Sequence, residues 1–292
     1  MKNRGVKIAL IIILAILSIA LIMVMVFKIV NKDMKFNLSL IGFGDKTEML
    51  FQEEYEVEAL ESIDVDVSSS NVRIEKTDTD KVKVTAYGDK GDTVQATINE
   101  NELSIRKQNT NLYIFTVFYW CREEIIIEIP NESDESFKIH TSSGDIITPN
   151  LENNQIQFET GSGDITCGNL YNGDLKSSSG DISIGDGNEI TLNTSSGKIK
   201  TGNVNMLNAK ASSGDIDTGT IEEGKVETSS GKITIEGAKR LQAQCSSGKM
   251  NITHIENYCE LSTSSGDIEI QSLNITENST ISAKSGNVDI RK

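Results

Sequence analysis

The sequence predicts an all-β protein, a parallel β-helix or β-solenoid with coils of about 17 residues, preceded by one N-terminal transmembrane helix. Three observations lead to this fold class. The motif Ser-Ser-Gly-Asp/Lys-Ile recurs down the C-terminal half, apolar and polar residues alternate between its copies, and a long apolar stretch lies near the N-terminus. A fixed period with strand-like content is typical of a solenoid, in which each unit buries its apolar face only against its neighbours.

Nine glycines mark the copies of the motif, and the intervals between them are 19, 17, 17, 17, 17, 17, 18 and 20 residues. This regularity indicates that one corner of the coil recurs at each glycine. We expect these glycines to have a positive φ, which is strained for any residue with a Cβ. The predicted structural repeat corners are Gly144, Gly163, Gly180, Gly197, Gly214, Gly231, Gly248, Gly266 and Gly286.

The residues between two glycines alternate as strands do. In the unit that begins at Gly180, Ile182 and Ile184 alternate with polar neighbours, and so do Ile190 and Leu192. A period of two indicates strands with one buried face. Glycine, serine and aspartate separate the two runs, so each coil is predicted to contain two short strands and two turns.

Two columns of uniform chemistry appear when the units are aligned on their glycines. The position two after the glycine is apolar and predicts an inner ladder, and the position three before it is small, as a tight inner corner requires. The apolar column contains Ile146, Ile165, Ile182, Ile199, Ile216, Ile233, Met250, Ile268 and Val288. The small column contains Thr141, Thr160, Ser177, Thr194, Ala211, Thr228, Cys245, Thr263 and Ala283.

A third column, directly after the glycine, is charged or polar. Coils stack at about 4.8 Å, so its side chains become neighbours. Stacked carboxylates could suggest calcium, but lysine would interrupt a calcium ladder, and we expect a solvated charge ladder instead. The column contains Asp145, Asp164, Asp181, Lys198, Asp215, Lys232, Lys249, Asp267 and Asn287.

The N-terminus has the pattern of a membrane anchor. Residues 1–7 form a basic n-region, and Ile8–Phe27 are twenty consecutive positions with only Ser18 as a polar interruption. A helix of this length would span about 30 Å, the thickness of the hydrocarbon core. We therefore predict a transmembrane signal anchor over residues 8–30, in the cell membrane, single-pass, with the N-terminus inside and the C-terminal domain extracytoplasmic.

Three further segments follow the anchor. Residues 31–48 are predicted as a linker, 49–135 as an N-terminal β region that caps the solenoid, and 136–292 as the repeat β-solenoid. Ser68–Val72 resembles a degenerate copy of the motif, with Asn71 in the glycine place. Clean alternation predicts strands within the β region at 63–67, 72–74 and 81–85, and further strands are predicted at 94–98, 102–106 and 125–129.

One run breaks the pattern. Residues 112–120 contain five of the fifteen aromatic residues, and both faces of the alternation are apolar. One interpretation is a buried strand or plug that caps the N-terminal end of the solenoid. The other is an exposed hairpin that docks on a partner or on the bilayer surface. In the second case the candidate partner-binding residues are Tyr113, Phe115, Tyr119 and Trp120.

Composition and motifs exclude several functions. A net charge of −15 without a basic patch argues against nucleic acid as a partner. The two histidines fit no metal spacing, and neither GxSxG nor a phosphate-cradling loop occurs. We therefore predict no catalytic, cofactor-binding or metal-binding residues, no cofactor, and a protein that is not an enzyme.

Two questions stay open. Cys167, Cys245 and Cys259 fall at inward positions and are expected to be small buried side chains, although a Cys245–Cys259 bridge is an alternative; Cys121 follows the aromatic run. Amide-rich insertions at 150–155 and 274–280 could contact a glycan or be plain loop extensions.

The runs Glu61-Ser-Ile-Asp-Val-Asp-Val-Ser-Ser-Ser-Asn-Val72 and Ile125-Ile-Ile-Glu-Ile-Pro130, with the repeated Ser-Ser-Gly-Asp-Ile, resemble a bacterial family. It is the putative-adhesin β-solenoid domain, a domain of unknown function, and the resemblance covers roughly residues 50–292. With its anchor, the chain resembles members associated with Gram-positive envelope-stress systems. The resemblance implies a surface-exposed solenoid, and it carries over no catalytic or ligand residues.

These observations predict a non-enzymatic, membrane-anchored, extracytoplasmic β-solenoid that acts as an adhesin-like or envelope-stress-associated binding protein. Its expected partners are the membrane, through residues 8–30, and an envelope protein or cell-wall component. Two alternatives are a glycan-binding or polysaccharide-active β-helix and a purely structural surface spacer.

Overall fold

The computed structural model describes most of the chain beyond the N-terminal segment. The described residues are 35–37, 47–57, 60–90, 92–108, 111–113 and 122–291. The predicted n-region, the signal anchor, most of the linker and most of the aromatic run lie outside them. No helix in these ranges has the length and hydropathy of a membrane span.

The chain divides into two units, residues 1–44 with 109–119 and residues 45–108 with 120–292. In the first unit the structure describes one parallel pair of short strands, β1 (Lys35–Asn37) and β8 (Asn111–Tyr113). This pair joins the segment after the predicted anchor to the start of the aromatic run.

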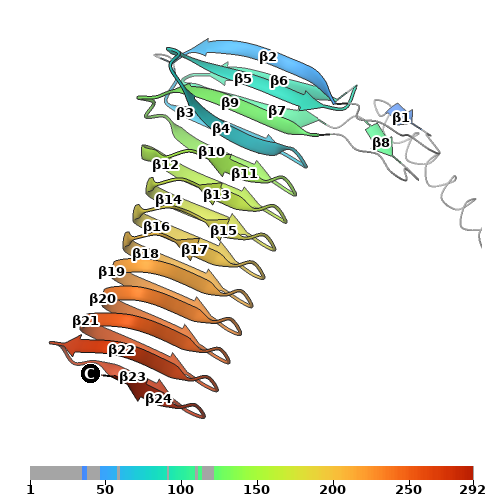
Figure 1. Cartoon of the computed structure of the whole chain (residues 1–292). Coiled ribbons are helices and arrows are strands. Elements are labelled where there is room, and N and C mark those ends of the chain that lie inside the picture. The colour runs from blue at the N-terminus through green and yellow to red at the C-terminus, as the bar shows by residue number, and fades with distance from the viewer. Residues whose placement is uncertain are drawn as a thin grey trace, which may run out of the picture. The chain divides into compact units, whose positions relative to one another are not determined.

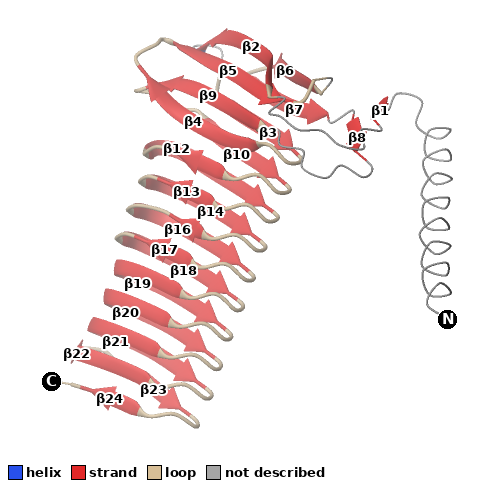
Figure 2. Cartoon of the chain, turned by 45° about the vertical axis from the view of Figure 1, so that its right-hand side comes forward, coloured by secondary structure: helices blue, strands red, loops and turns tan. Residues whose placement is uncertain are grey.

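The second unit is a solenoid of two strand stacks (Figures 1 and 2). The long-strand stack contains β6 (Thr93–Asn99), β7 (Glu102–Gln108), β3 (Ser62–Val67), β10 (Ser136–Thr141), β12 (Leu151–Thr160), β14 (Leu170–Ser177), β16 (Gly187–Thr194), β18 (Val204–Ala211) and β23 (Thr280–Ala283). The opposite stack contains β2 (Glu48–Glu56), β5 (Lys81–Gly88), β9 (Glu124–Pro130), β4 (Asn71–Thr77), β11 (Ile146–Thr148), β13 (Ile165–Cys167), β15 (Ile182–Ser183), β17 (Ile199–Thr201) and β24 (Val288–Ile290). Three longer strands contribute to both stacks: β19 (Ile216–Thr228), β20 (Ile233–Cys245) and β21 (Met250–Thr263). The strand β22 (Ile268–Ile275) pairs in parallel with the first part of β21.

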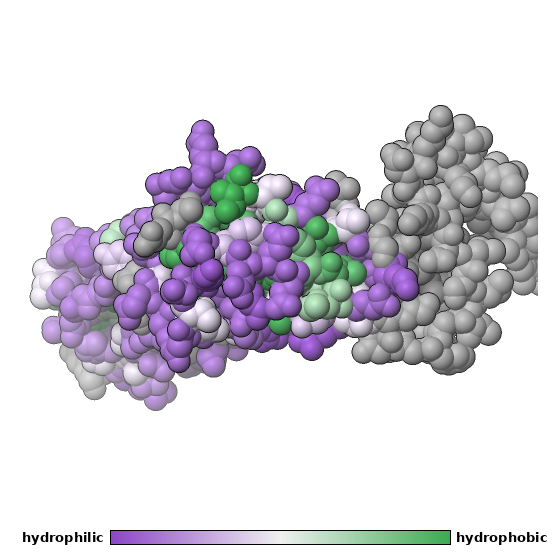
Figure 3. All heavy atoms as spheres, turned by 90° about the horizontal axis from the view of Figure 1, so that it is seen from above, coloured by the Kyte–Doolittle hydropathy of each residue, from purple (hydrophilic) through white to green (hydrophobic). Residues whose placement is uncertain are grey.

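Strand direction changes at the N-terminal end of this unit. The coils pair in parallel from β3 and β4 onward, whereas β6 with β7, β5 with β9 and β2 with β5 are antiparallel. Seen from that end, the surface is mostly hydrophilic with a few hydrophobic patches (Figure 3). The antiparallel strands thus end the parallel ladder with a different pairing geometry.

The core is formed by inward apolar side chains of both stacks, and the predicted inner ladder supplies one side of it. All members of the ladder are fully buried except Val288, which is 43% exposed in the last described coil. Each predicted strand between residues 63 and 129 is present, and Pro130 ends β9 as expected. The all-β solenoid with coils of about 17 residues is therefore confirmed.

The predicted positive φ of the corner glycines is wrong, because none of them has a φ in the left-handed region. They are required for a steric reason instead. A Cβ on any of the nine would lie 1.6–1.9 Å from the carbonyl oxygen of the corner residue one coil earlier. Successive backbones therefore approach too closely at this corner for any side chain.

The predicted place of Asn71 is also wrong, by one residue. Val72 pairs with Ile146, so Ser70 occupies the glycine place and Asn71 begins the charged column. In register, Ser70 lies next to Glu123 of the coil formed by β7 and β9, at the place where later coils have a glycine. The Nζ atom of the buried Lys107 donates to Ser70 Oγ (3.1 Å) there.

The small column and the charged column both hold the corner together. Thr194 Oγ1 donates to Gly180 O (3.2 Å) and accepts from Gly197 N (3.1 Å), and the other hydroxyls of its column repeat at least one of these bonds. Asp181 Oδ1 accepts from Lys198 N (2.7 Å), and the remaining aspartates bond the next coil in the same way. Six of the nine members of the charged column are exposed as expected, and Asp145, Lys249 and Asp267 are half-buried; the aspartates are backbone acceptors as well as surface charges.

The three described cysteines are buried and free. A Cys245–Cys259 bridge is therefore wrong, and the expectation of small buried side chains is confirmed. Burial raises the pKa of the Cys167 thiol to about 12, which keeps it protonated and unreactive at neutral pH. Cys245 replaces a hydroxyl of the small column, because its Sγ accepts from Gly248 N (2.9 Å).

Gly214→Ala is predicted to destabilise the solenoid strongly. The new Cβ would lie 1.6 Å from Gly197 O, so two coils must separate, at a cost of about 3 kcal/mol or more. Gly237→Ala is the matched control, because its nearest neighbour would be Thr220 Cγ2 at 3.4 Å, an ordinary contact. Thermal unfolding of the two variants tests this, and equal melting temperatures would contradict the close approach of the coils.

Asp181→Ala is predicted to lose about 1 kcal/mol of unfolding free energy, because Lys198 N loses its acceptor. Asp181→Asn keeps the acceptor oxygen without the charge and should retain wild-type stability, as Asn71 does the same work for Asp145 N (2.9 Å). Chemical denaturation distinguishes the two roles. If both variants lose the same stability, the column acts through its charge alone.

Candidate functional site

Outward side chains of the long-strand stack form straight rows. Alternation points every second residue outward, and the parallel register places equivalent residues of successive coils side by side. Row A contains Gln155, Asn172, Glu189, Met206, Glu223, Arg240 and Tyr258. Row B contains Gln157, Asp174, Thr191, Asn208, Lys225, Gln242 and Glu260.

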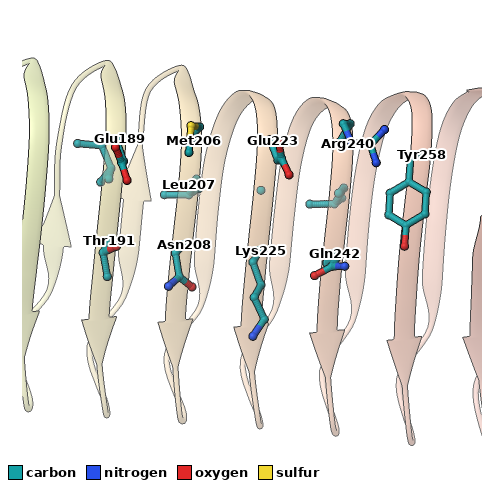
Figure 4. Close-up of a pocket in the computed structure, with 13 residues that line it drawn as sticks. Glu189, Thr191, Met206, Leu207, Asn208, Glu223, Lys225, Arg240, Gln242 and Tyr258 are labelled. Carbon is teal, nitrogen blue, oxygen red and sulfur yellow. The ribbon is translucent and has the colours of Figure 1, made fainter.

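A furrow runs between these rows, across the strands and along the solenoid axis. Figure 4 shows the two rows on either side of it, with Met206 and Asn208, for example, on one strand. The furrow deepens over β16, β18, β19, β20 and β21 into a hollow of about 420 Å³. Gly224 lies on its floor, and the side chain of Ile221 fills the core space that a larger residue would take.

The furrow continues toward the N-terminal end of the unit. The rows extend through β10, β3 and β7, where Ser62 pairs with Ser136 and Asp64 with Lys138. A second hollow of about 360 Å³ lies there, between the same two rows. At the usual strand spacing, the ten strands from β7 to β21 give the furrow a length of about 43 Å.

A one-residue insertion shapes the C-terminal end of the furrow. The register shifts between Ala238 and Arg240, and Asn257 has a left-handed φ of 61°, a conformation that asparagine tolerates. This bulge, which explains the 18-residue interval, sets Tyr258 beside Arg240. The Arg240 guanidinium lies 5.1 Å from the centroid of the Tyr258 ring and also pairs with Glu277.

The larger hollow is electrically balanced although the chain is acidic. Its lining has two carboxylates, Glu189 and Glu223, and two cations, Lys225 and Arg240, whereas the whole chain has a net charge of −15. Lys225 also bonds Glu227 in the neighbouring row (2.8 Å), and this hydrogen bond holds the pKa of the Glu227 carboxyl below its usual range.

Several polar side chains in the hollow can form hydrogen bonds with a ligand. Glu189, Thr191 and Asn208 make no side-chain hydrogen bond to another described residue, and Met206 is 50% exposed. These side chains therefore offer carboxylate, hydroxyl and amide groups, together with apolar surface, to a ligand from outside.

The residues singled out from the sequence lie elsewhere. Of the candidate partner-binding residues, only Tyr113 falls in a described strand, β8, and Phe115, Tyr119 and Trp120 lie outside the described residues. The corner glycines form one edge of the coils. His140 and His254 lie apart, each beside one glutamate, and the described residues include no cluster of metal-ligating side chains.

The amide-rich insertions differ from the expected loops. Residues 152–154 belong to β12 as an irregularity in its register, and the second insertion reduces to a short connection between β22 and β23 that contains Glu277. The sequence analysis considered these two insertions as candidate sites and did not predict the furrow. The signal that could have found it is the pair of outward columns in the repeat alignment.

Comparisons with known proteins found one family and several solved structures. A family model described as Toastrack DUF4097 matches residues 60–219 and 185–292. Solved structures similar to this chain include a putative adhesin from Parabacteroides distasonis, with 15% identity and a TM-score of 0.49, over 88% of this chain and 100% of that chain. A putative lipid binding protein from the same organism has 17% identity and a TM-score of 0.45, with the same coverage. A putative adhesin from Bacteroides fragilis has 13% identity and a TM-score of 0.38, over 85% of this chain and 100% of that one. No curated protein matches the chain.

Proposed function

The chain belongs to the Toastrack DUF4097 family, and from this premise we propose that it is a non-enzymatic, membrane-anchored, extracytoplasmic binding protein. In this proposal the solenoid is a rigid support with an adhesin-like or envelope-stress-associated role. Its partner is an envelope protein or a cell-wall component.

The furrow is the observation that carries the binding role. Inward positions are filled by the core, and the corner positions are used in bonds between coils. In the outward rows, Glu189, Thr191 and Asn208 make no side-chain hydrogen bond to another described residue, and they lie on a face that the stack keeps straight. A rigid, preorganised surface favours binding because little conformational entropy is lost when a ligand docks.

The aromatic run supports a second contact. It lies between β7 and β9, where other coils have only a three-residue corner, so it is a local departure from the repeat. The parallel pair of β1 and β8 ties its beginning to the segment that follows residues 8–30. We propose residues 8–30 as the anchor and Tyr113, Phe115, Tyr119 and Trp120 as the contact with a membrane partner.

Protease treatment of intact cells tests the location. A C-terminal epitope tag should be lost when protease is added outside, because the solenoid would be extracytoplasmic. A variant without residues 8–27 should leave the membrane fraction. A tag that stays protected until the cells are lysed would refute the proposed orientation.

Photo-crosslinking in cells tests the binding role. A photoreactive residue in place of Tyr119 or Met206 should give specific adducts with an envelope protein or wall component, identified by mass spectrometry. Lys200 is the control position, because it is exposed on the opposite stack. If all three positions give only links within the chain, the protein is a spacer and the proposal fails.

A further inference from the structure

We infer that the furrow binds a linear, uncharged glycan with acetamido groups, which lies along the solenoid axis with its main contacts in the larger hollow. This inference rests on the proposed function, since it assigns the ligand of the same extracytoplasmic surface. Four properties of the furrow carry it.

The first property is direction. The two rows that flank the furrow cross about ten strands in register, with the two open hollows between them. The strands that form it are paired on both sides, so a peptide in the furrow has no free strand edge to extend. Recognition must come from side chains repeated along the axis, which suits a polymer with repeated polar groups.

The second property is the polar chemistry of the hollow. Glu189 and Asn208 lie on opposite sides of the furrow and make no hydrogen bond to another described residue. A carboxylate accepts from sugar hydroxyls, and an amide both donates and accepts. Asn208 and Gln242 can therefore pair with acetamido groups, which have the same donor and acceptor pattern.

The third property is apolar surface at the same place. Tyr258 presents its ring beside Arg240, and Met206 is half exposed. The C–H face of a pyranose ring is apolar, so it gains by packing on an aromatic ring or a thioether. Binding sites with such surfaces and a few placed polar groups are typical for small and polymeric ligands.

The fourth property is charge. The two cations of the hollow, Lys225 and Arg240, already pair with Glu227 and Glu277, so the hollow offers no net attraction to an anionic polymer. The acidic chain around it repels polyanions. An uncharged ligand has no such penalty, which favours a neutral glycan over anionic polymers of the cell surface.

The test is a titration of the full chain in detergent micelles with the β-1,4-linked hexamer of N-acetylglucosamine. We expect saturable binding, and a loss of affinity of about fivefold or more in Asn208→Ala and Tyr258→Ala. The matched control is Asn193→Ala, which also removes an outward asparagine that makes no hydrogen bond to another described residue, but one outside the furrow lining. Each variant should keep the wild-type melting temperature, because these side chains lie outside the core.

Four results would overturn the inference: no binding of the hexamer, equal binding in wild type and both furrow variants, equal affinity for the glucose hexamer, or tighter binding of a polyanion such as polyglutamate. Failure here is distinguishable from failure of the proposed function. Adducts from position 206 with an envelope protein, without hexamer binding, would refute the glycan alone. Hexamer binding by a protein that the protease assay places inside the cell would refute the location alone.

Discussion

The close approach of successive coils at one corner is the constraint on which the solenoid depends. Carbonyl oxygens of one coil occupy the space that side chains of the next would need, so glycine recurs there. Hydroxyls and carboxylates beside the glycine then bond the backbone groups that this contact brings together. Because the interior is filled by inward apolar side chains of both stacks, only the outward rows are free to vary with function.

Much of this architecture could be predicted from the repeat, because a period of 17 with alternating polarity has few other solutions. The family resemblance, inferred from the same residues, is confirmed by the family match. The reason for the glycines was not predictable, since it depends on the distance between backbones rather than on local conformation. The position of Ser70 was predictable from the sequence, because aligning Val72 with the apolar column places Ser70 two residues earlier, in the glycine place.

The furrow was harder to predict than the fold. Its rows depend on the register of every coil, and both the irregularity in β12 and the bulge at Asn257 shift that register. The pairing of Arg240 with Tyr258 exists only because one extra residue precedes Tyr258. Insertions in a repeat are therefore informative through the outward side chains that they realign, as well as through the loops that they add.

Variation within the corner columns makes the coil boundaries unequal. At the boundary between the coils of Gly197 and Gly214, Ala211 has no hydroxyl and Lys198 has no acceptor, so both corner bonds are missing. In a linear array, cohesion is a sum of nearest-neighbour terms, and at this boundary the ion pair of Lys198 with Asp217 and the hydrogen bonds from Thr220 to Asn203 Oδ1 supply them instead. Met206 and Glu223 flank it in the furrow. A ligand that contacts both residues would add to the interactions between these two coils, so we expect occupancy of the furrow to stabilise this part of the stack.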